Sequence, residues 1–275
     1  MKFSEKWYSY YYGEYSVEEF VESFILSNPD EMERFRKIIS LIPSDAKSVL
    51  DVGCGEGLFL YLLEKERRIK GMGIEISEKK IDYARKHLNV NAELGDASNL
   101  KFGDRSFDVV TALEVLEHLP YGIYEEALKE IDRVADKYII ISVPYDEQRI
   151  FITCPYCKTK FHPSYHLRTF KEKDIINLFP SFKLDSVERI GATYIYPNLL
   201  FRVGQILKVK INIWYMCPAC GYSELPRKTD NKKDSGIYSE GIRKKLTSLL
   251  KLISKIIFKR SKWLVGVYKR RNKIL

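Results

Sequence analysis

The glycine-rich stretch 51–57, Asp-Val-Gly-Cys-Gly-Glu-Gly, constrains the fold more than any other part of the chain. It ends an apolar, strand-like run at 48–54 and leads into 57–67, whose apolar residues recur at helical spacing. Glycines between a strand and a helix allow the backbone to turn sharply and to approach a ligand closely. The spacing is G-x-G-x-G, because Leu58 stands where the dinucleotide fingerprint has its third glycine. The loop therefore predicts a strand–turn–helix unit that holds a ligand.

Strand-like and helical segments alternate from Lys47 to Pro144, which predicts a parallel, doubly wound α/β sheet. The further strands expected here are 71–76, 92–97, 107–115 and 137–144, and the further helices are 77–88 and 122–135. Two helices are expected ahead of the sheet, at 16–26 and 31–42. After 145–168, Thr169 begins a capping-box pattern that predicts a helix over 170–179. Strands are then expected at 182–191 and 263–270.

Acidic residues end the two strands that follow the glycine loop. Glu75 lies about 20 residues beyond the glycines, at the position where an acid accepts hydrogen bonds from ribose hydroxyls. Asp96 ends the next strand, where it is placed to contact an adenine edge. These acids, the loop with Asp51 and the run FDVVTALEVLEHL (107–119) form an ordered set that is far more specific than glycines alone. This set resembles the class I S-adenosylmethionine-dependent methyltransferases, particularly the small-molecule group with the ubiquinone- and menaquinone-type enzymes.

The resemblance implies a Rossmann-like, mostly parallel seven-stranded sheet, with S-adenosyl-L-methionine lying across the carboxyl ends of its strands. The final strand, 263–270, would then be antiparallel. Gly53 and Gly55 would pass beneath the methionine part of the cofactor, and Asp51 would act on its amino group from behind the loop. The cofactor-binding residues that the resemblance implies are Asp51, Gly53, Gly55, Glu75, Ile76, Asp96, Ala97, Leu113 and Glu114.

Methyl transfer from a sulfonium is an in-line displacement, so positioning can carry much of the barrier. A general base is needed only when the acceptor is a hydroxyl or another group that is protonated at neutral pH. The candidate catalytic bases are His118, His162 and His166, together with Tyr145. Each of the histidines also has a purely structural interpretation.

Two C-P-x-C motifs predict a metal site. Cys154 and Cys157 stand in the first, and Cys217 and Cys220 stand in the second, with 59 residues between Cys157 and Cys217. Two such pairs make a tetrahedral thiolate site that favours structural Zn²⁺. The alternatives are a local site of Cys154, Cys157, His162 and His166, or buried thiols without a metal. The motifs follow the fifth and sixth strands, which would end at the same edge of the sheet, so we expect the cysteines to meet there.

These observations divide the chain into five parts. Residues 145–168 and 193–235, called the cap below, are expected to form a zinc-ribbon-like insertion that walls the acceptor pocket. The other expected parts are an N-terminal helical segment (1–46), the cofactor-binding core (47–144), the completion of the sheet (169–192 and 261–275) and a basic amphipathic helix (237–260).

Positive charge is concentrated near the C-terminus. Residues 226–275 contain 16 Lys or Arg and 3 Asp or Glu, a segment charge of +13. This exceeds the net charge of the whole chain, +9, so the other residues together are slightly acidic. An apolar stripe opposes these charges: Ile242, Leu246, Leu249, Leu250, Ile253, Ile256 and Ile257. The helix is expected either to pack on the protein, to lie on an anionic membrane through 240–260, or to bind RNA phosphates.

The expected function is methyl transfer to a small-molecule, lipid-linked or glycan acceptor. Two alternatives remain: a tRNA or rRNA methyltransferase, and a non-catalytic zinc-ribbon interaction protein. The core has no (N/D)PPY-type motif and its charge is not basic, which disfavours nucleic acid. No apolar run reaches about 18 residues and the first residues lack a signal-peptide block, so a cytoplasmic location is expected, with peripheral contact at the inner membrane face as an option.

Overall fold

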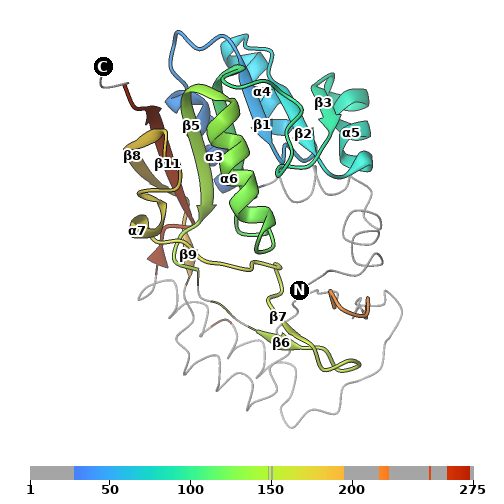
Figure 1. Ribbon diagram of the computed structural model, residues 1–275. Coiled ribbons are helices and arrows are strands. Elements are labelled where there is room, and N and C mark those ends of the chain that lie inside the picture. Colours follow the sequence, from blue (N-terminus) through green and yellow to red (C-terminus); the bar gives the residue numbers. More distant parts are fainter. Residues whose placement is uncertain are drawn as a thin grey trace.

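Figure 1 shows the computed structural model of the chain. The structure describes residues 28–147, 149, 151–194, 217–222, 248 and 259–272. The expected helix over 16–26 and the whole apolar stripe from Ile242 to Ile257 lie outside these residues. None of the helices in the described part of the chain is long and apolar enough to cross a membrane.

A seven-stranded sheet forms the centre of the molecule, in the order β3-β2-β1-β4-β5-β11-β8. Its strands are β1 (Val49–Val52), β2 (Met72–Glu75), β3 (Asn91–Leu94), β4 (Phe107–Leu113), β5 (Ala135–Pro144), β8 (Phe182–Ile190) and β11 (Trp263–Arg270). Only β11 runs antiparallel to its neighbours, β5 and β8. The Rossmann-like, mostly parallel seven-stranded sheet is therefore confirmed. The strand order reverses between β1 and β4, and ligands bind at such a switch point, outside the carboxyl ends of the strands.

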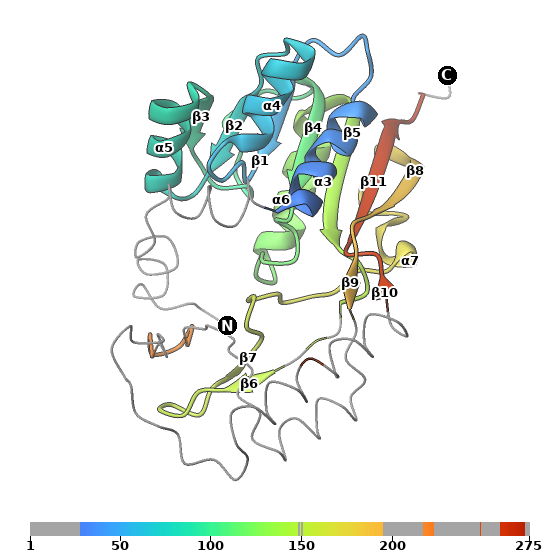
Figure 2. The same ribbon diagram turned by 180° about the vertical axis from the view of Figure 1, so that it is seen from behind.

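Helices cover both faces of this sheet (Figures 1 and 2). One face carries α3 (Pro29–Leu41), α4 (Leu58–Arg67) and α5 (Glu78–Leu88), and the other carries α6 (Ile123–Val134) and α7 (Glu172–Ile175). Successive strand residues point to opposite faces. Accordingly, Val49 and Val109 belong to the core under α3 and α4, whereas Leu50 and Val110 belong to the core under α6. Two apolar layers thus hold the central strands in a fixed position.

The expected helix after Thr169 is much shorter than the sequence pattern indicates. Phe170 is still extended, because it forms a bridge with Tyr145, and its carbonyl accepts a hydrogen bond from the backbone of Asp146 at 2.6 Å. The helix-capping residue is Lys171 rather than Thr169, and α7 ends at Ile175. The expectation of a helix over 170–179 was therefore wrong at both ends.

A small hairpin and a second two-stranded pair lie outside the main sheet. β6 (Ile152–Thr153) pairs with β7 (Lys160–Phe161), and Figures 1 and 2 both place this hairpin beyond the carboxyl ends of the parallel strands. β9 (Thr193–Tyr194) pairs with β10 (Lys259–Arg260). Because β10 is a strand, the helix expected over 237–260 does not extend to its predicted end.

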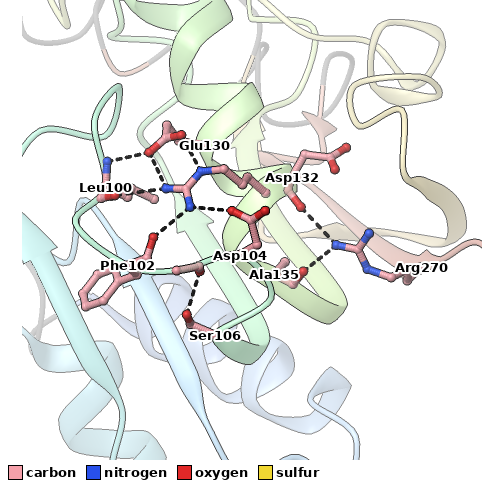
Figure 3. A network of polar contacts seen from close by, with 10 residues as sticks. Leu100, Phe102, Asp104, Ser106, Glu130, Asp132, Ala135 and Arg270 are labelled. Atoms are coloured by element: carbon pink, nitrogen blue, oxygen red, sulfur yellow. Dashed lines mark hydrogen bonds and ion pairs between the residues drawn. The ribbon is translucent and has the colours of Figure 1, made fainter.

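The loop after β3 is anchored to α6 by a polar network, which Figure 3 shows around Glu130. The Arg133 guanidinium donates to both oxygens of Glu130 at 2.8 Å, and also to the backbone carbonyls of Leu100 and Phe102 at 3.0 and 2.8 Å. Glu130 in turn accepts a hydrogen bond from the Leu100 backbone at 2.7 Å. The network fixes the segment that follows Asp96, on the expected adenine side of the site.

Candidate active site

The glycine loop closes over the end of β2. The backbone N–H groups of Gly53 and Cys54 both donate to the carbonyl of Ile74, at 2.7 and 3.0 Å. Gly53 has a φ of +75°, and a Cβ added there would lie 2.4 Å from Cγ2 of Val115. Gly55 also has a positive φ, but an added Cβ would meet nothing closer than the Lys80 ammonium at 3.9 Å. Gly53 is therefore required by packing, whereas the space beside Gly55 is open to a ligand.

The Glu75 carboxylate ties this loop to the end of β2. Oε2 accepts a hydrogen bond from the Gly55 backbone at 3.0 Å, and Oε1 accepts from the backbones of Ile76 and Ser77 at 2.8 and 2.9 Å. Three backbone donors hold the carboxylate in one orientation, and an ionised carboxylate still has acceptor capacity for further donors. The side chain of Ile76 next to it is 52% exposed. An oriented acid beside an exposed apolar side chain fits a ribose with its attached base.

Asp96 and Asp51 flank this arrangement on two sides. Asp96 follows β3, and its Oδ1 accepts hydrogen bonds from the backbone and hydroxyl of Ser98, both at 2.8 Å. Asp51 is buried beneath the loop, where its Oδ1 accepts a hydrogen bond from the Thr111 hydroxyl at 2.6 Å. Burial raises the pKa of Asp51 to about 7, against the opposing effects of that hydrogen bond and of Arg34. A cationic group above the loop would favour the ionised form of Asp51.

Glu114 leaves the end of β4 with a positive φ of 58°, and its carboxylate is held by two other strands. The hydroxyl of Ser142 on β5 donates to Oε1, and the indole N–H of Trp263 on β11 donates to Oε2, both at 3.0 Å. Arg34 on α3 donates to the Ser142 hydroxyl at 3.3 Å. Burial raises the pKa of Glu114, and the Arg34 charge opposes this effect. Its preceding residue, Leu113, is buried at the end of β4.

The three candidate catalytic histidines lie together at the carboxyl edge. The ring centroid of His166 is 4.8 Å from that of His118 and 5.2 Å from that of His162. Nδ1 of His166 is in close contact with Oε2 of Glu147, and Nε2 of His162 lies 4.0 Å from the same oxygen. Burial and the nearby His166 lower the pKa of His118 to about 3. Tyr145 belongs to a different group, with the Arg189 guanidinium 5.2 Å from its ring centroid.

Sequence reasoning overlooked several residues of this edge. Glu117 is completely buried beside His118, and burial together with the charge of Glu114 raises its pKa. Its position three residues after Glu114 was a visible signal, because both carboxylates follow the same buried strand. Glu147 and Trp263 gave no such signal, because their partners are distant in the sequence.

The central part of the chain is similar to known methyltransferases. Residues 49–137 match the family model described as a methyltransferase domain. The match includes the glycine loop and the strands from β1 to β4. Over 100 residues the chain is 38% identical to a ubiquinone biosynthesis O-methyltransferase of Coxiella burnetii, a match of 34% of this chain and 41% of that protein. Over 113 residues it is 32% identical to norajmaline N-methyltransferase of Rauvolfia serpentina, covering 38% of each chain.

The match to these curated relatives spans about two fifths of their length. A solved structure, the SAM-dependent methyltransferase from Archaeoglobus fulgidus, aligns with 91% of this chain and 98% of its own, at 20% identity and a TM-score of 0.51. The MccD protein aligns with 88% of this chain and 98% of its own, at 16% identity and a TM-score of 0.52. These two likenesses show that the chain shares the fold of these two structures.

The four cap cysteines come together. Cys154 Sγ lies 3.7 Å from Cys220 Sγ, and Cys157 Sγ lies 3.4 Å from Cys217 Sγ. All four sulfurs lie within 4.8 Å of one another. A zinc tetrahedron with bonds of about 2.3 Å has sulfur–sulfur edges of roughly 3.8 Å. The sulfur positions therefore suit a four-thiolate zinc site.

The two cysteine motifs have the same backbone geometry. In the first, the Lys158 N–H donates to the Cys154 carbonyl at 3.0 Å, and in the second the Gly221 N–H donates to the Cys217 carbonyl at 2.9 Å. Both residues that follow the second cysteine have a positive φ, 62° at Lys158 and 71° at Gly221. The Cys154 N–H donates to the carbonyl of Thr159, just as the Cys217 N–H donates to that of Tyr222. Two equivalent turns thus present their sulfurs to one point.

Proposed function

We propose that this protein transfers a methyl group from S-adenosyl-L-methionine to a small-molecule acceptor. The observation that carries the proposal is the Glu75 carboxylate, which is oriented by three backbone donors directly below an open glycine loop at the switch point of the sheet. The names of the relatives, an O-methyltransferase and an N-methyltransferase for small molecules, support the same class of acceptor.

Each part of the cofactor would meet a matching group of this chain. Glu75 and Ile76 would hold the ribose, and Asp96 with Ala97 would contact the adenine. Gly53 and Gly55 would lie beneath the methionine part, and Leu113 and Glu114 would lie near the sulfonium. The ionised, buried carboxylate of Asp51 would attract the ammonium group of the cofactor and so favour its binding. Bound cofactor supplies an electrophilic methyl group, and the residues of this chain orient it.

The acceptor would be placed between the core and the cap, in front of His118, His162 and His166. If the acceptor is a hydroxyl, one of these imidazoles would take its proton as the oxygen attacks the methyl carbon. We propose that the cap, tied by zinc at Cys154, Cys157, Cys217 and Cys220, walls this side of the pocket. A four-thiolate zinc has no open coordination position, so its role would be to fold the cap.

The finer acceptor class that we propose is lipid-linked or glycan. It rests on the apolar stripe and the basic charge of 240–260, which suit an anionic membrane surface beside the pocket. Binding to liposomes with and without anionic lipid tests this part. Deletion of 237–258, which keeps β10, should abolish the binding without unfolding the core, and an intact protein that ignores anionic liposomes would exclude the idea.

A methyl-transfer assay with labelled cofactor tests the activity itself. Cell extract would be divided into lipid, glycan, RNA and small-molecule pools, and label should pass into one of the lipid, glycan or small-molecule pools. Glu75→Gln should lose the transfer, whereas Asp82→Asn, a change at an exposed acid on α5, should retain it. Transfer into the RNA pool alone would replace the proposed acceptor class with nucleic acid.

A further inference from the structure

Glu117 is a buried carboxylate without a directly bonded cation, although the charges of Arg34 and Arg168 act on it from further away. The residue is fully buried, and neither carboxylate oxygen has a hydrogen-bond partner in the described part of the chain. Removing a carboxylate from water without hydrogen bonds or a counter-charge is strongly unfavourable. Buried charges in proteins are paired or coordinate metals. A cation bound directly to these oxygens would supply the partner that the described side chains do not provide.

Two imidazoles face this carboxylate. His118 Nε2 lies 4.0 Å from Glu117 Oε1, and the ring of His166 is inclined at 73° to that of His118. The ligand atoms that Glu117, His118 and His166 offer all lie within 4.8 Å of one another. Two imidazoles and one carboxylate are a common ligand set for divalent first-row transition metals, and they leave coordination positions open.

Both imidazoles are also held from behind. Nδ1 of His166 contacts the Glu147 carboxylate, and the backbone of Tyr165 is hydrogen-bonded to the imidazole of His118. Histidines that bind metals usually donate their second N–H to a carboxylate or a carbonyl in this way, which fixes the tautomer and the ring orientation. His162 stacks on His166 with ring centroids 5.2 Å apart, and its Nε2 lies 4.0 Å from the same Glu147 oxygen.

The three residues are brought together by the contact between core and cap. Glu117 and His118 follow β4, whereas His166 comes from the segment after β7. The Leu167 N–H donates to the Glu117 carbonyl at 2.8 Å, and Arg168 donates to the carbonyls of Leu116 and Leu119 at 2.5 and 2.6 Å. These bonds hold the two segments in register, so the ligand set is fixed by backbone contacts and not by surface side chains alone.

We propose that Glu117, His118 and His166 bind one divalent transition-metal ion, with Glu147 and His162 supporting the ligands. This site shares no ligand with the four-cysteine site, and it supplies nitrogen and oxygen ligands instead of sulfur. Its open positions suit the oxygen of an acceptor hydroxyl, whose pKa a bound cation lowers. The activation of an acceptor hydroxyl rests on the proposed function. With the ion bound, His118 and His166 act as its ligands and do not accept the hydroxyl proton. The acceptor proton then passes to solvent, the oxygen–carbon bond forms, and the carbon–sulfur bond breaks with its electron pair left on sulfur.

Manganese binding to the full chain tests the site without cofactor or acceptor. Mn²⁺ favours oxygen and nitrogen ligands over thiolates, so protein loaded with one zinc per chain should bind one Mn²⁺, as followed by electron paramagnetic resonance. Glu117→Gln and His166→Gln should each weaken Mn²⁺ binding at least about tenfold, the effect of losing roughly 1.4 kcal/mol. His87→Gln, a change at an exposed histidine on α5, should bind Mn²⁺ as the wild type does.

Two results would overturn the site: wild-type protein that binds no Mn²⁺, or Glu117→Gln protein that binds Mn²⁺ with unchanged affinity. Mn²⁺ should also raise the melting temperature of the wild type and of His87→Gln, but not that of Glu117→Gln. If Glu117→Gln does not fold, the affinity of His166→Gln decides the question. Loss of Mn²⁺ binding with normal cofactor binding would remove this site and leave the proposed methyl transfer standing.

Discussion

The sulfur atoms of Cys157 and Cys217 lie 3.4 Å apart, although the residues are 60 positions apart in the chain. Each sulfur is presented by a turn of the same geometry, closed by a hydrogen bond to the carbonyl of the first cysteine of its motif. Four thiols at this distance repel one another once they ionise, and a divalent cation removes that repulsion. The arrangement therefore leads to a direct prediction about zinc.

The purified protein should contain one zinc ion held by the cap cysteines. Cys217→Ser should lose this zinc, because one of four ligands is removed, and the cap hairpin should exchange its amide hydrogens faster as a result. Metal content by mass spectrometry is the measurement. Cys54→Ser is the matched control, because Cys54 lies in the glycine loop and should leave the zinc in place. Zinc retained by Cys217→Ser at full occupancy would contradict the prediction.

Gly53→Ala should destabilise the fold and abolish cofactor binding. The new Cβ would lie 2.4 Å from Val115 Cγ2, and the φ of +75° adds strain of about 1–3 kcal/mol. Urea unfolding measures the loss. The double variant Gly53→Ala with Val115→Ala removes the clash but keeps the backbone strain, so it should recover only part of the stability. Equal stability of Gly53→Ala and the wild type would show that the loop has a different conformation.

Asp51 should make cofactor binding depend on pH. Its pKa is raised to about 7 in the folded protein, above the value of 3.8 for an exposed aspartate, so its contribution to stability is full below pH 3.8 and is lost as the pH rises through 7. A cofactor ammonium favours the ionised form, so its affinity should increase as the pH rises towards 7 and level off above it. Calorimetry at several pH values measures this slope. Asp51→Asn should bind more weakly with less pH dependence, and an unchanged slope in that variant would exclude Asp51 as the cause.

Trp263→Phe should destabilise the protein by about 1–3 kcal/mol, because Glu114 Oε2 would lose its donor in a buried position. Unfolding in urea is again the measurement. A double-mutant cycle with Glu114→Gln separates this hydrogen bond from the loss of indole packing. Additive effects of the two changes would mean that the indole and the carboxylate do not interact.

Local patterns predicted the parts of the site that lie within one strand and the turn after it. Gly53, Glu75 and Asp96 each lie at or just after a strand end, and the structure ties Glu75 to the glycine loop through the Gly55 backbone. The fold class could be predicted for the same reason, since seven strand-like segments and their helices were visible in order. The antiparallel position of 263–270 came from the family resemblance.

The contacts that the sequence did not predict join distant segments. The hydrogen bonds among Arg34, Ser142 and Glu114 form because α3 packs on the sheet beside β4 and β5. The order of the strands determines this packing, and the order is not visible in a local sequence pattern. His166 lies close to Glu117 because the cap segment folds back against the residues after β4. Thr169 shows the opposite error, because its capping pattern was local and plausible, yet the bridge between Phe170 and Tyr145 prevented the helix from starting there.

Cofactor binding measured by calorimetry tests the central claim most directly. Zinc-loaded wild-type protein should bind one S-adenosylhomocysteine per chain. Glu75→Gln should weaken this binding about 10- to 100-fold, as expected for the loss of charge-assisted hydrogen bonds of about 1.5–3 kcal/mol, while Asp82→Asn should bind normally. A folded, zinc-loaded wild-type protein that binds neither S-adenosylhomocysteine nor S-adenosyl-L-methionine would contradict the account.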